Sequence, residues 1–405
     1  MTNLASFRVA LIGSVFLMGG ADWPKFRGPD ASSVAADAKL PVTWGEGQNI
    51  VWRIDLPGRG VSGPIIVRDR VFITATSGFR HTRLHVLCFN ATTGDRLWER
   101  QFWATGRTST HNSISGAAPT PASDGKYVYA FFSSNDLVCL DFDGNLLWYR
   151  GLAHDYPKSG NDVGMACSPL VVDGVVVVQV ESQSEAFAVG VDASTGENRW
   201  RVERSKVAGW SSPIAIPGKG GRKTSVLLQS RDRLTAHEPR SGEELWRWEA
   251  ECAATPSSLV SGDVLFTPMG GLTALKFSDE SSSPEVLWDA FRMRPGAPSP
   301  IVYDGRVYAL SGAILKCADA QTGELQWQLR LKGNHWATPV VAGGHMYCIN
   351  FDGEARVVKL GGAKGEIVGE HAFGQQIHAS PAIVDNAMYV RCDKYLWKIA
   401  EVDGS

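Results

Sequence analysis

Side chains that could bind a ligand are concentrated in a few connections between apolar segments of the sequence. Two of these connections are long and polar, residues 104–121 and 152–169, and shorter ones supply further aromatic, histidine and arginine residues. Loops that a rigid scaffold holds in place often carry the binding residues of a protein. The candidate ligand-binding residues are His111, Asn112, Asn161, Asp162, Trp210, Arg292, Arg294, His335, Trp336 and His378.

The sequence lacks the short motifs that define common catalytic and metal sites. It has no Cys-x-x-Cys, no His-Glu-x-x-His and no Gly-x-Ser-x-Gly between a strand and a helix. The stretch GKGGRKTS at 218–225 lacks the spacing of a phosphate-binding loop, and DFDGN at 141–145 lacks the glutamate that completes an EF-hand. We therefore predict no catalytic residue and no metal site.

The cysteines are dispersed along the chain. They occupy positions 88, 139, 167, 252, 317, 348 and 392, and none is adjacent to another. Because Cys88, Cys139 and Cys317 take the same small-residue position of a repeated pattern, we expect buried free thiols. The odd number argues against a full disulfide framework and leaves one bridge open.

A pattern that ends in tryptophan recurs along the chain. Full copies are CFNATTGDRLW (88–98), GVDASTGENRW (190–200), AHEPRSGEELW (236–246) and CADAQTGELQW (317–327). CLDFDGNLLW (139–148) is shorter, and ALKFSDESSSPEVLW (274–288) has lost its glycine. Prolines at 64, 121, 169, 213, 256, 300, 339 and 381 each precede an apolar run. A repeat of roughly 40 to 50 residues that contains several short strands is typical of a β-propeller blade.

The repeats predict an all-β, eight-bladed propeller over residues 49–400. The last repeat, SPAIVDNAMYVRCDKYLWKIA at 380–400, ends after three strands, whereas NIVWRIDLPG at 49–58 resembles a fourth strand. We expect the 49–58 strand to complete the last blade, which closes the ring and removes unpaired edges. Repeat seven carries Gly369 in place of tryptophan, so we expect it to pack most loosely, and Trp288 to dock less completely than Trp327.

This hairpin resembles the tryptophan-docking motif of pyrroloquinoline quinone (PQQ) repeat proteins. The resemblance implies that each repeat tryptophan packs against the neighbouring blade. The docking residues are then Trp52, Trp98, Trp148, Trp200, Trp246, Trp288 and Trp327. The family contains quinoprotein alcohol dehydrogenases, which hold PQQ and Ca²⁺ in a central funnel, and non-catalytic members such as the lipoprotein that assists outer-membrane β-barrel assembly. The dehydrogenases of this family have longer chains than this one. They also usually carry adjacent cysteines, which this sequence lacks.

The N-terminal residues precede the repeats. Residues 1–21 resemble a secretory signal peptide with an apolar stretch from Val9 to Met18 and small residues before a cleavage site after Ala21. That stretch is too short to span a bilayer, and no cysteine follows it for a lipid anchor; a buried N-terminal strand is the alternative. DWPKFRGPDASSV is similar to the opening of secreted PQQ-repeat proteins of planctomycete-type bacteria. We expect residues 22–48 to extend across the ring, anchored by Trp23 and Phe26, and residues 401–405 to form a tail.

The charge composition of the sequence argues against one class of partner. The formal net charge is −2 and no sustained basic run occurs, which argues against a nucleic-acid partner. We expect a periplasmic or secreted, monomeric, non-catalytic scaffold that binds a protein or glycan partner at the funnel mouth, with no cofactor and no transmembrane segment. The alternative is a PQQ-dependent oxidoreductase with PQQ and calcium in the funnel. A hydrolase that uses histidine and aspartate groups of the funnel is a third hypothesis.

Overall fold

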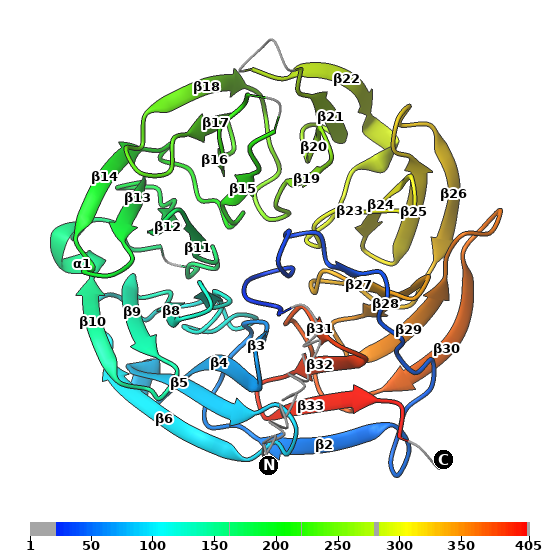
Figure 1. The fold of residues 1–405 in the computed structure, drawn as a ribbon, viewed down its shortest axis with the longest axis horizontal. Coiled ribbons are helices and arrows are strands. Elements are labelled where there is room, and N and C mark those ends of the chain that lie inside the picture. Colours follow the sequence, from blue (N-terminus) through cyan, green and yellow to red (C-terminus); the bar gives the residue numbers. More distant parts are fainter. Residues whose placement is uncertain (1–21, 162, 220, 279–282, 403–405) are drawn as a thin grey trace, which may run out of the picture.

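Eight four-stranded units surround a central axis (Figure 1), which confirms the predicted β-propeller. The computed structural model describes residues 22–161, 163–219, 221–278 and 283–402. Each unit is an antiparallel sheet whose shortest strand lies nearest the axis. Helical structure in the described residues is limited to α1 (Leu152–Asp155) and the 3₁₀ turns η1 (Phe79–His81) and η2 (Phe291–Met293).

The blades are numbered along the chain, and their strands are given from the axis outward. Blade one contains β3 (Ile65–Val67), β4 (Arg70–Ser77), β5 (Arg83–Asn90) and β6 (Arg96–Trp103). Blade two contains β7 (Ala122–Ser123), β8 (Tyr127–Phe131), β9 (Asp136–Asp141) and β10 (Leu146–Gly151). Blade three contains β11 (Leu170–Val172), β12 (Val175–Val180), β13 (Phe187–Asp192) and β14 (Asn198–Glu203). Blade four contains β15 (Ile214–Ile216), β16 (Ser225–Gln229), β17 (Arg233–His237) and β18 (Glu244–Glu249).

The second half of the ring repeats this arrangement. Blade five contains β19 (Leu259–Ser261), β20 (Val264–Thr267), β21 (Leu272–Lys276) and β22 (Glu285–Ala290). Blade six contains β23 (Ile301–Tyr303), β24 (Arg306–Ser311), β25 (Ile314–Asp319) and β26 (Leu325–Arg330). Blade seven contains β27 (Val340–Ala342), β28 (His345–Ile349), β29 (Glu354–Lys359) and β30 (Glu366–Ala372). Blade eight contains β31 (Ala382–Val384), β32 (Ala387–Arg391), β33 (Tyr395–Ala400) and β2 (Ile50–Asp55).

The ring closes through a strand from each end of the described chain. Strand β2 pairs antiparallel with β33, and Arg53 lies opposite Trp397. This pairing confirms the predicted closure by the N-terminal strand. It also means that no hairpin turn joins the two outermost strands of blade eight, because they come from opposite ends of the sequence.

The repeated Gly and Trp form the contact between one blade and the next. A methyl group on Gly144 would lie 2.8 Å from the ring of Trp98, so only glycine lets the turn of blade two approach that indole. The Nε1–H of Trp98 then donates to the carbonyl oxygen of Phe142 at 2.8 Å. Equivalent bonds run from Trp148 to Ala193, from Trp200 to Pro239 and from Trp288 to Ala320. An indole suits this role because it buries a large apolar area and keeps one donor.

The expectation that Trp288 docks less completely than Trp327 is wrong. Both side chains are 8% exposed. The indole of Trp288 also donates to Ala320, whereas Nε1 of Trp327 is buried without a partner. The glycine missing from blade five's own hairpin has no effect on Trp288, because this tryptophan packs against Gly323 in the turn of blade six.

Blade seven is not loosely packed, because the N-terminal segment fills the position of its missing tryptophan. Trp44 is 5% exposed and lies over His371, with ring centroids 4.1 Å apart. A Cβ atom on Gly369 would lie 2.2 Å from the carbonyl oxygen of Val42, so the segment occupies the space that a side chain would need. The same oxygen is 2.9 Å from Nε2 of His371.

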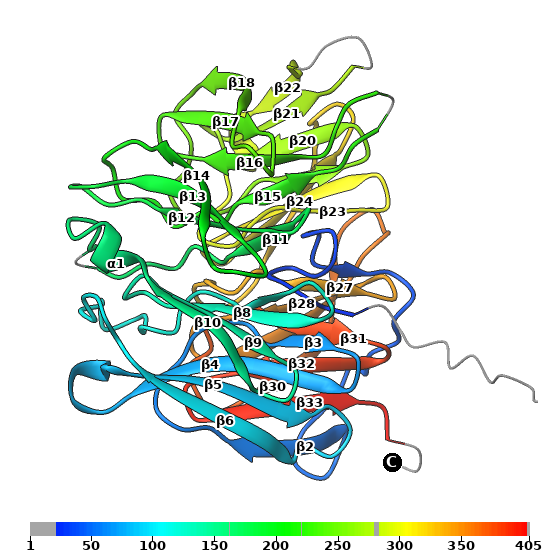
Figure 2. The same ribbon diagram turned by 60° about the vertical axis from the view of Figure 1, so that its left-hand side comes forward.

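Residues 22–44, which we call the strap, cross one face of the ring. The strap begins near the axis and runs outward past β27 (dark blue in Figure 1), and it lies on the face opposite to α1 (Figure 2). Its strand β1 (Val34–Ala35) pairs parallel with β27, and Trp23 exchanges backbone hydrogen bonds with Ile66.

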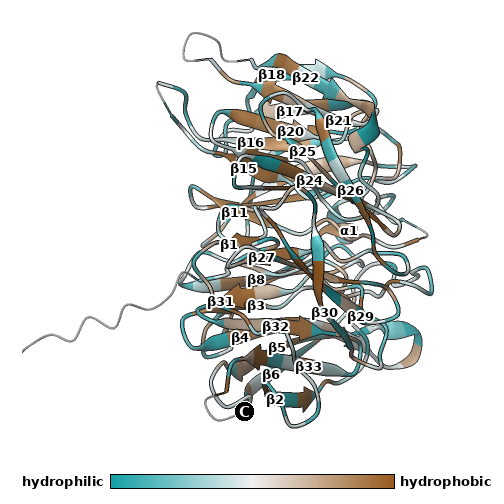
Figure 3. Cartoon of the chain, turned by 90° about the vertical axis from the view of Figure 1, so that its right-hand side faces the viewer, coloured by the Kyte–Doolittle hydropathy of each residue, from teal (hydrophilic) through white to brown (hydrophobic). Residues whose placement is uncertain are grey.

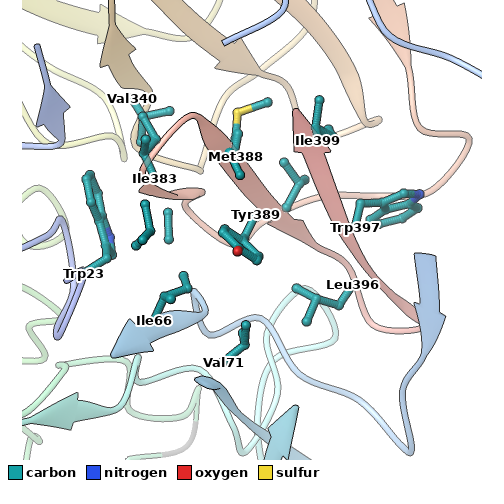
Figure 4. Packing of buried hydrophobic residues seen from close by; sticks show 14 of the residues in the cluster. Trp23, Ile66, Val71, Val340, Ile383, Met388, Tyr389, Leu396, Trp397 and Ile399 are labelled. Carbon is teal, nitrogen blue, oxygen red and sulfur yellow. The ribbon is translucent and has the colours of Figure 1, made fainter. Parts of the chain in front are cut away.

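The strap shares a core with three blades. Figure 4 shows Trp23 beside Ile66 of blade one and Ile383 of blade eight. Hydrophobic residues also fill the stacked inner strands of the ring (Figure 3).

Candidate functional site

A ring of hydroxyl groups surrounds the axis where the innermost strands begin. Each blade places one small residue there, and in blades one to seven the backbone N–H of this residue donates to the side-chain oxygen of its equivalent in the next blade, at 2.9 to 3.1 Å. We call these residues the hydroxyl belt: Thr120, Ser168, Ser212, Ser257, Ser299, Thr338 and Ser380. Gly63 of blade one takes the eighth position. Proline follows the belt residue in seven blades, but in blade five Pro256 precedes Ser257, so this proline is not equivalent to the others.

A second ring lies two residues before the belt in sequence. Both rings line a central channel of about 130 Å³. The second ring consists of Val61, Ala118, Ala166, Trp210, Thr255, Ala297, Trp336 and His378. Because the side chains alternate with a spacing of two, each blade presents one residue of each ring to the axis. Phe26 also lines this channel. It belongs to the strap, which crosses the face opposite to α1 (Figure 2).

The channel widens into a cavity of about 390 Å³ at the face that carries the long loops. Its lining is mostly apolar and comprises His111, Ile114, Val163, Ala166, Trp210, Thr255, Ala297 and Trp336. Trp210 lies in the connection that enters blade four. Trp336 lies in the connection that enters blade seven, three blades further around the ring. The two indoles therefore approach the axis from different sides. We call this cavity and the channel beneath it the funnel.

Four of the ten predicted binding residues line the funnel. His111, Trp210 and Trp336 line its mouth, and His378 lines the channel. The indole of Trp210 is held by a 2.9 Å hydrogen bond to the carbonyl oxygen of Gly164. The His378 ring lies 5.5 Å from that of Trp336, and burial lowers the pKa of this imidazole.

The other predicted residues have different surroundings. Asn112 lines a separate cavity of about 320 Å³ with Arg59 and Arg80. The side-chain nitrogen of Asn161 donates to the carbonyl oxygen of Glu181 at 3.3 Å, and its oxygen accepts from the backbone of Val163 at 3.0 Å, so it shapes the loop.

The remaining predicted positions do not contribute to the funnel as described. Arg292 and Arg294 are exposed at η2 and line neither the mouth nor the channel. His335 is 3% exposed, and its Nδ1 is 2.8 Å from the carbonyl oxygen of Gly312; burial lowers the pKa of this imidazole. Asp162 lies outside the described residues.

Sequence reasoning missed the small and aliphatic residues of the funnel. Ile114, Val163, Ala166, Thr255 and Ala297 carry little chemistry of their own, so a search for polar and aromatic side chains passed over them. The positions of Ala166 and Ala297 were nevertheless detectable, because each stands three residues before one of the repeated prolines, Pro169 and Pro300.

The described residues of the funnel do not fit a PQQ and calcium site. Calcium prefers several oxygen ligands, chiefly carboxylates. No described residue that lines the mouth or the channel is a carboxylate. No group of three or more His, Cys, Asp or Glu side chains in the described part of the chain could hold a metal ion. All seven cysteines are free and buried. The described lining therefore lacks the oxygen ligands for a calcium ion beside a quinone.

A serine, a histidine and a glutamate form a hydrogen-bonded chain on blade one. Ser77 Oγ is 2.6 Å from His85 Nε2, and His85 Nδ1 is 2.7 Å from Glu99 Oε1. Sequence inspection did not pair them because they lie on three successive strands. His85 is 3% exposed and shares a blade face with Ala75, which belongs to the core that includes blade eight. These three hydrogen-bonded side chains lie outside the funnel. They are therefore not the histidine and aspartate groups of the funnel that the hydrolase hypothesis requires.

The fold and the docked tryptophans define an eight-bladed propeller of the PQQ-repeat class. The chain belongs to the family described as outer membrane protein assembly factor BamB, whose model matches residues 33–218, 104–263, 190–353 and 311–405. The structure is similar to BamB from Moraxella catarrhalis, with a TM-score of 0.64 and 16% identity over 88% of this chain and 98% of that one. It is also similar to a europium-containing methanol dehydrogenase, with a TM-score of 0.71 and 12% identity over 94% of this chain and 98% of that one. These two likenesses concern the fold alone.

Similar sequences include dehydrogenases. A polyvinylalcohol dehydrogenase from a Pseudomonas species is 25% identical over 334 residues, which cover 70% of this chain and 46% of that protein. Subunit 1 of the methanol dehydrogenase from Methylobacterium organophilum is 29% identical over 145 residues, which cover 31% of this chain and 22% of the subunit. The chain thus spans about half the length of the first of these relatives, and less of the second. Within the described residues, no helix is long and apolar enough to cross a membrane.

Proposed function

We propose that the protein is a non-catalytic scaffold that binds a protein or glycan partner at the funnel mouth. The observation that carries this proposal is the composition of the mouth, where two tryptophans and His111 surround a mostly apolar cavity of about 390 Å³. Tryptophan combines a large apolar surface with one hydrogen-bond donor, and it is enriched at the energetic centres of protein interfaces. In proteins that bind glycans, aromatic ring faces pack against the C–H groups of sugars, so the same indoles suit a glycan. The proposal includes a periplasmic or extracellular location after removal of residues 1–21, and a monomeric state.

The loops that form the mouth are held in place before a partner binds. Trp210 is fixed by its bond to Gly164, and Asn161 ties the loop before blade three to Glu181. The belt beneath fixes the start of every innermost strand through bonds between neighbouring blades. A site that is already ordered loses less conformational entropy when it binds. This rigidity supports recognition of a partner by shape.

The proposal is tested by substitution of the two mouth tryptophans. We expect Trp210→Ala and Trp336→Ala each to weaken binding of the preferred ligand at least tenfold, measured by calorimetry against defined oligosaccharides and extended peptides. Trp103→Ala is the matched control, because Trp103 is 64% exposed on β6 and does not line the funnel. Equal affinity of all three variants and the native protein would contradict a binding role for the mouth.

The oxidoreductase alternative has its own test. The dehydrogenase relatives motivate it, while the described funnel residues disfavour it. We expect that incubation with PQQ and Ca²⁺ yields no stoichiometric complex by absorbance and no dye-linked oxidation of alcohols or sugars. A one-to-one complex with turnover would replace the scaffold proposal.

A further inference from the structure

The strap turns one arginine into the interior of the molecule. Arg27 is 2% exposed and has a φ of 67°, a left-handed conformation that is uncommon for residues other than glycine. The next residue, Gly28, has a φ of 83°, and a Cβ atom on it would lie 3.0 Å from the ring of Trp23. The packing of Gly28 on Trp23 therefore fixes the turn that directs Arg27 inward.

The guanidinium of Arg27 is incompletely bonded. Its Nη2 donates to the carbonyl oxygen of Ser258 in blade five at 2.6 Å. Its Nε and Nη1 are buried without a hydrogen-bond partner. No ion pair compensates its charge among residues 22–402 as described, and burial alone lowers its pKa to about 9, so the group is still a cation at neutral pH.

A second buried arginine of the same protein, Arg204, has a carboxyl group beside it. Arg204 is 4% exposed, and its Nε lies 3.6 Å from Oε1 of Glu181. It also donates to the Thr235 and Ser230 side chains. A buried charge without a partner is costly, and proteins usually pair it or bind a counterion. Arg27 has the burial of Arg204 but has no carboxyl group beside it.

A small cavity adjoins Arg27 between the strap and the innermost strands of blades three and four. Its volume is about 10 Å³, which suits one water molecule or one monatomic ion. Its polar lining comes from Lys25, Arg27, Ser168 and Ser212, and no carboxylate lines it. Both serines belong to the hydroxyl belt, where each oxygen accepts an N–H from the previous blade. Each hydroxyl hydrogen therefore remains free to be donated to an occupant.

We propose that this cavity is an anion site that binds one small monovalent anion of the halide class, with Arg27 as its principal ligand. The ammonium, guanidinium and hydroxyl groups of the lining can all donate hydrogen bonds. The lining therefore suits an occupant that only accepts hydrogen bonds, such as a halide ion. Water would accept some of these bonds but would leave the charge of Arg27 uncompensated. A carboxylate or phosphate exceeds the volume. The site lies beneath the funnel and is independent of the partner that binds at the mouth.

A crystal grown in sodium bromide tests the proposal directly. Diffraction at the bromine absorption edge should give an anomalous difference peak within hydrogen-bond distance of Nε or Nη1 of Arg27. The same map contains a control, because no peak should appear beside Arg204, which already has Glu181 as a partner. A peak-free cavity, or density that remains in place without anomalous signal, would show that only water binds there and would overturn the proposal.

Unfolding in solution gives a second readout. Chloride should raise the urea midpoint of the native protein relative to methanesulfonate at the same ionic strength, because an anion bound only by the folded state stabilises it by mass action. Arg27→Gln should abolish this difference between the two salts, and Arg27→Lys should retain part of it. If the native protein has equal midpoints in both salts, from millimolar to 0.5 M or so, the site does not bind chloride.

Discussion

The indole of Trp44 lies 4.1 Å, centroid to centroid, from the imidazole of His371 on the outermost strand of blade seven. In the repeats, the tryptophan of one blade packs on the turn glycine of the next, as Trp98 does on Gly144. Blade eight has no such turn, because β33 and β2 come from opposite ends of the chain. A tryptophan at position 369 would have no glycine to contact. The strap supplies Trp44 to this interface instead.

Removal of that indole should destabilise the ring as strongly as removal of a repeat tryptophan. We expect Trp44→Ala to lower the free energy of unfolding by about 3 to 5 kcal/mol, the usual cost of a buried tryptophan. Trp103→Ala, at 64% exposure, should cost about 0.5 kcal/mol or less. Urea denaturation of both variants checks this, and equal midpoints would show that the strap contributes nothing to the interface.

The indole hydrogen bond should separate two equally buried tryptophans. Trp288→Ala should cost at least as much as Trp327→Ala, each on the order of 3 to 5 kcal/mol, because both are 8% exposed and only Trp288 donates to a carbonyl oxygen. Equilibrium denaturation of the single and double variants measures this. A much smaller loss of unfolding free energy for Trp288→Ala than for Trp327→Ala would contradict this prediction. It would support the weaker docking of Trp288 that the sequence suggests. The two losses need not add, because Trp288 packs on the turn of the blade that carries Trp327.

Deletion of residues 49–58 should leave the outer edge of β33 unpaired, while its inner edge stays paired with β32. Strand β2 provides the outer partner of β33, and exposed strand edges associate readily. We expect aggregation or unfolding of the deletion variant, measured by size-exclusion chromatography and thermal melting. A monomer with an unchanged melting temperature would mean that closure by β2 contributes nothing to stability.

Stability should depend on the protonation of Glu181. Burial raises the pKa of this carboxyl from 4.5 to about 7, although Arg204 opposes the shift. The folded protein therefore holds a proton that the unfolded chain releases near pH 4.5, so the contribution of Glu181 to stability falls as the pH rises from about 4.5 to about 7.

Glu181→Gln should remove that decline. Urea denaturation at pH 5, 6, 7 and 8 measures the slope, and Glu243→Gln at an exposed position is the control. Histidines with lowered pKa values away from the Glu181 and Arg204 pair, such as His335 and His378, titrate in all variants and cancel in the comparison. Identical slopes for the native protein and Glu181→Gln would contradict the prediction.

The thiols should be unreactive until the protein unfolds. All seven cysteines are buried and free, and burial raises the pKa of Cys88 and Cys252 to about 12. A thiol reagent at pH 8 should label close to none of them in the native protein, and all seven in guanidinium chloride. Two thiols missing after denaturation would reveal a disulfide.

The fold was predictable because its signal is repeated. The spacing of prolines and tryptophans gave the number of blades, and the strand at 49–58 gave the closure. Individual departures were not predictable in the same way. Gly369 indicated loose packing because the sequence gives no local sign that Trp44 contacts blade seven. The contact between Trp44 and His371 joins residues that are far apart in the sequence. Pro256 looked like the other prolines, although Ser257 and not Thr255 is the belt residue.

The lining of the funnel was predictable only in part. Trp210, Trp336 and His378 were identified because they are large and stand just before an innermost strand. Arg292 and Arg294 precede an innermost strand as well, but they lie five or more residues before Ser299, beyond the two positions that face the axis. The buried charge of Arg27 and the pairing of Glu181 with Arg204 depend on contacts between distant segments, which spacing along one chain does not encode.

The junction between blades eight and one, which we call the clasp, differs from the other seven because Gly63 takes the belt position of blade one. The bonds of the hydroxyl belt lead from blade one through to blade eight and stop at Ser380, because Gly63 has no hydroxyl, and a Cβ there would lie 2.9 Å from the carbonyl oxygen of Ser380. Blades eight and one are joined by Arg391, which donates to Ser62 Oγ at 2.6 Å, and by Asp393, which accepts from the backbone of Gly60 at 2.9 Å. When the molecule is pulled by its two ends, we expect β2 to separate from β33 first, because the pulled ends meet at Ile50 and Ile399, and the clasp to bear load only after that separation.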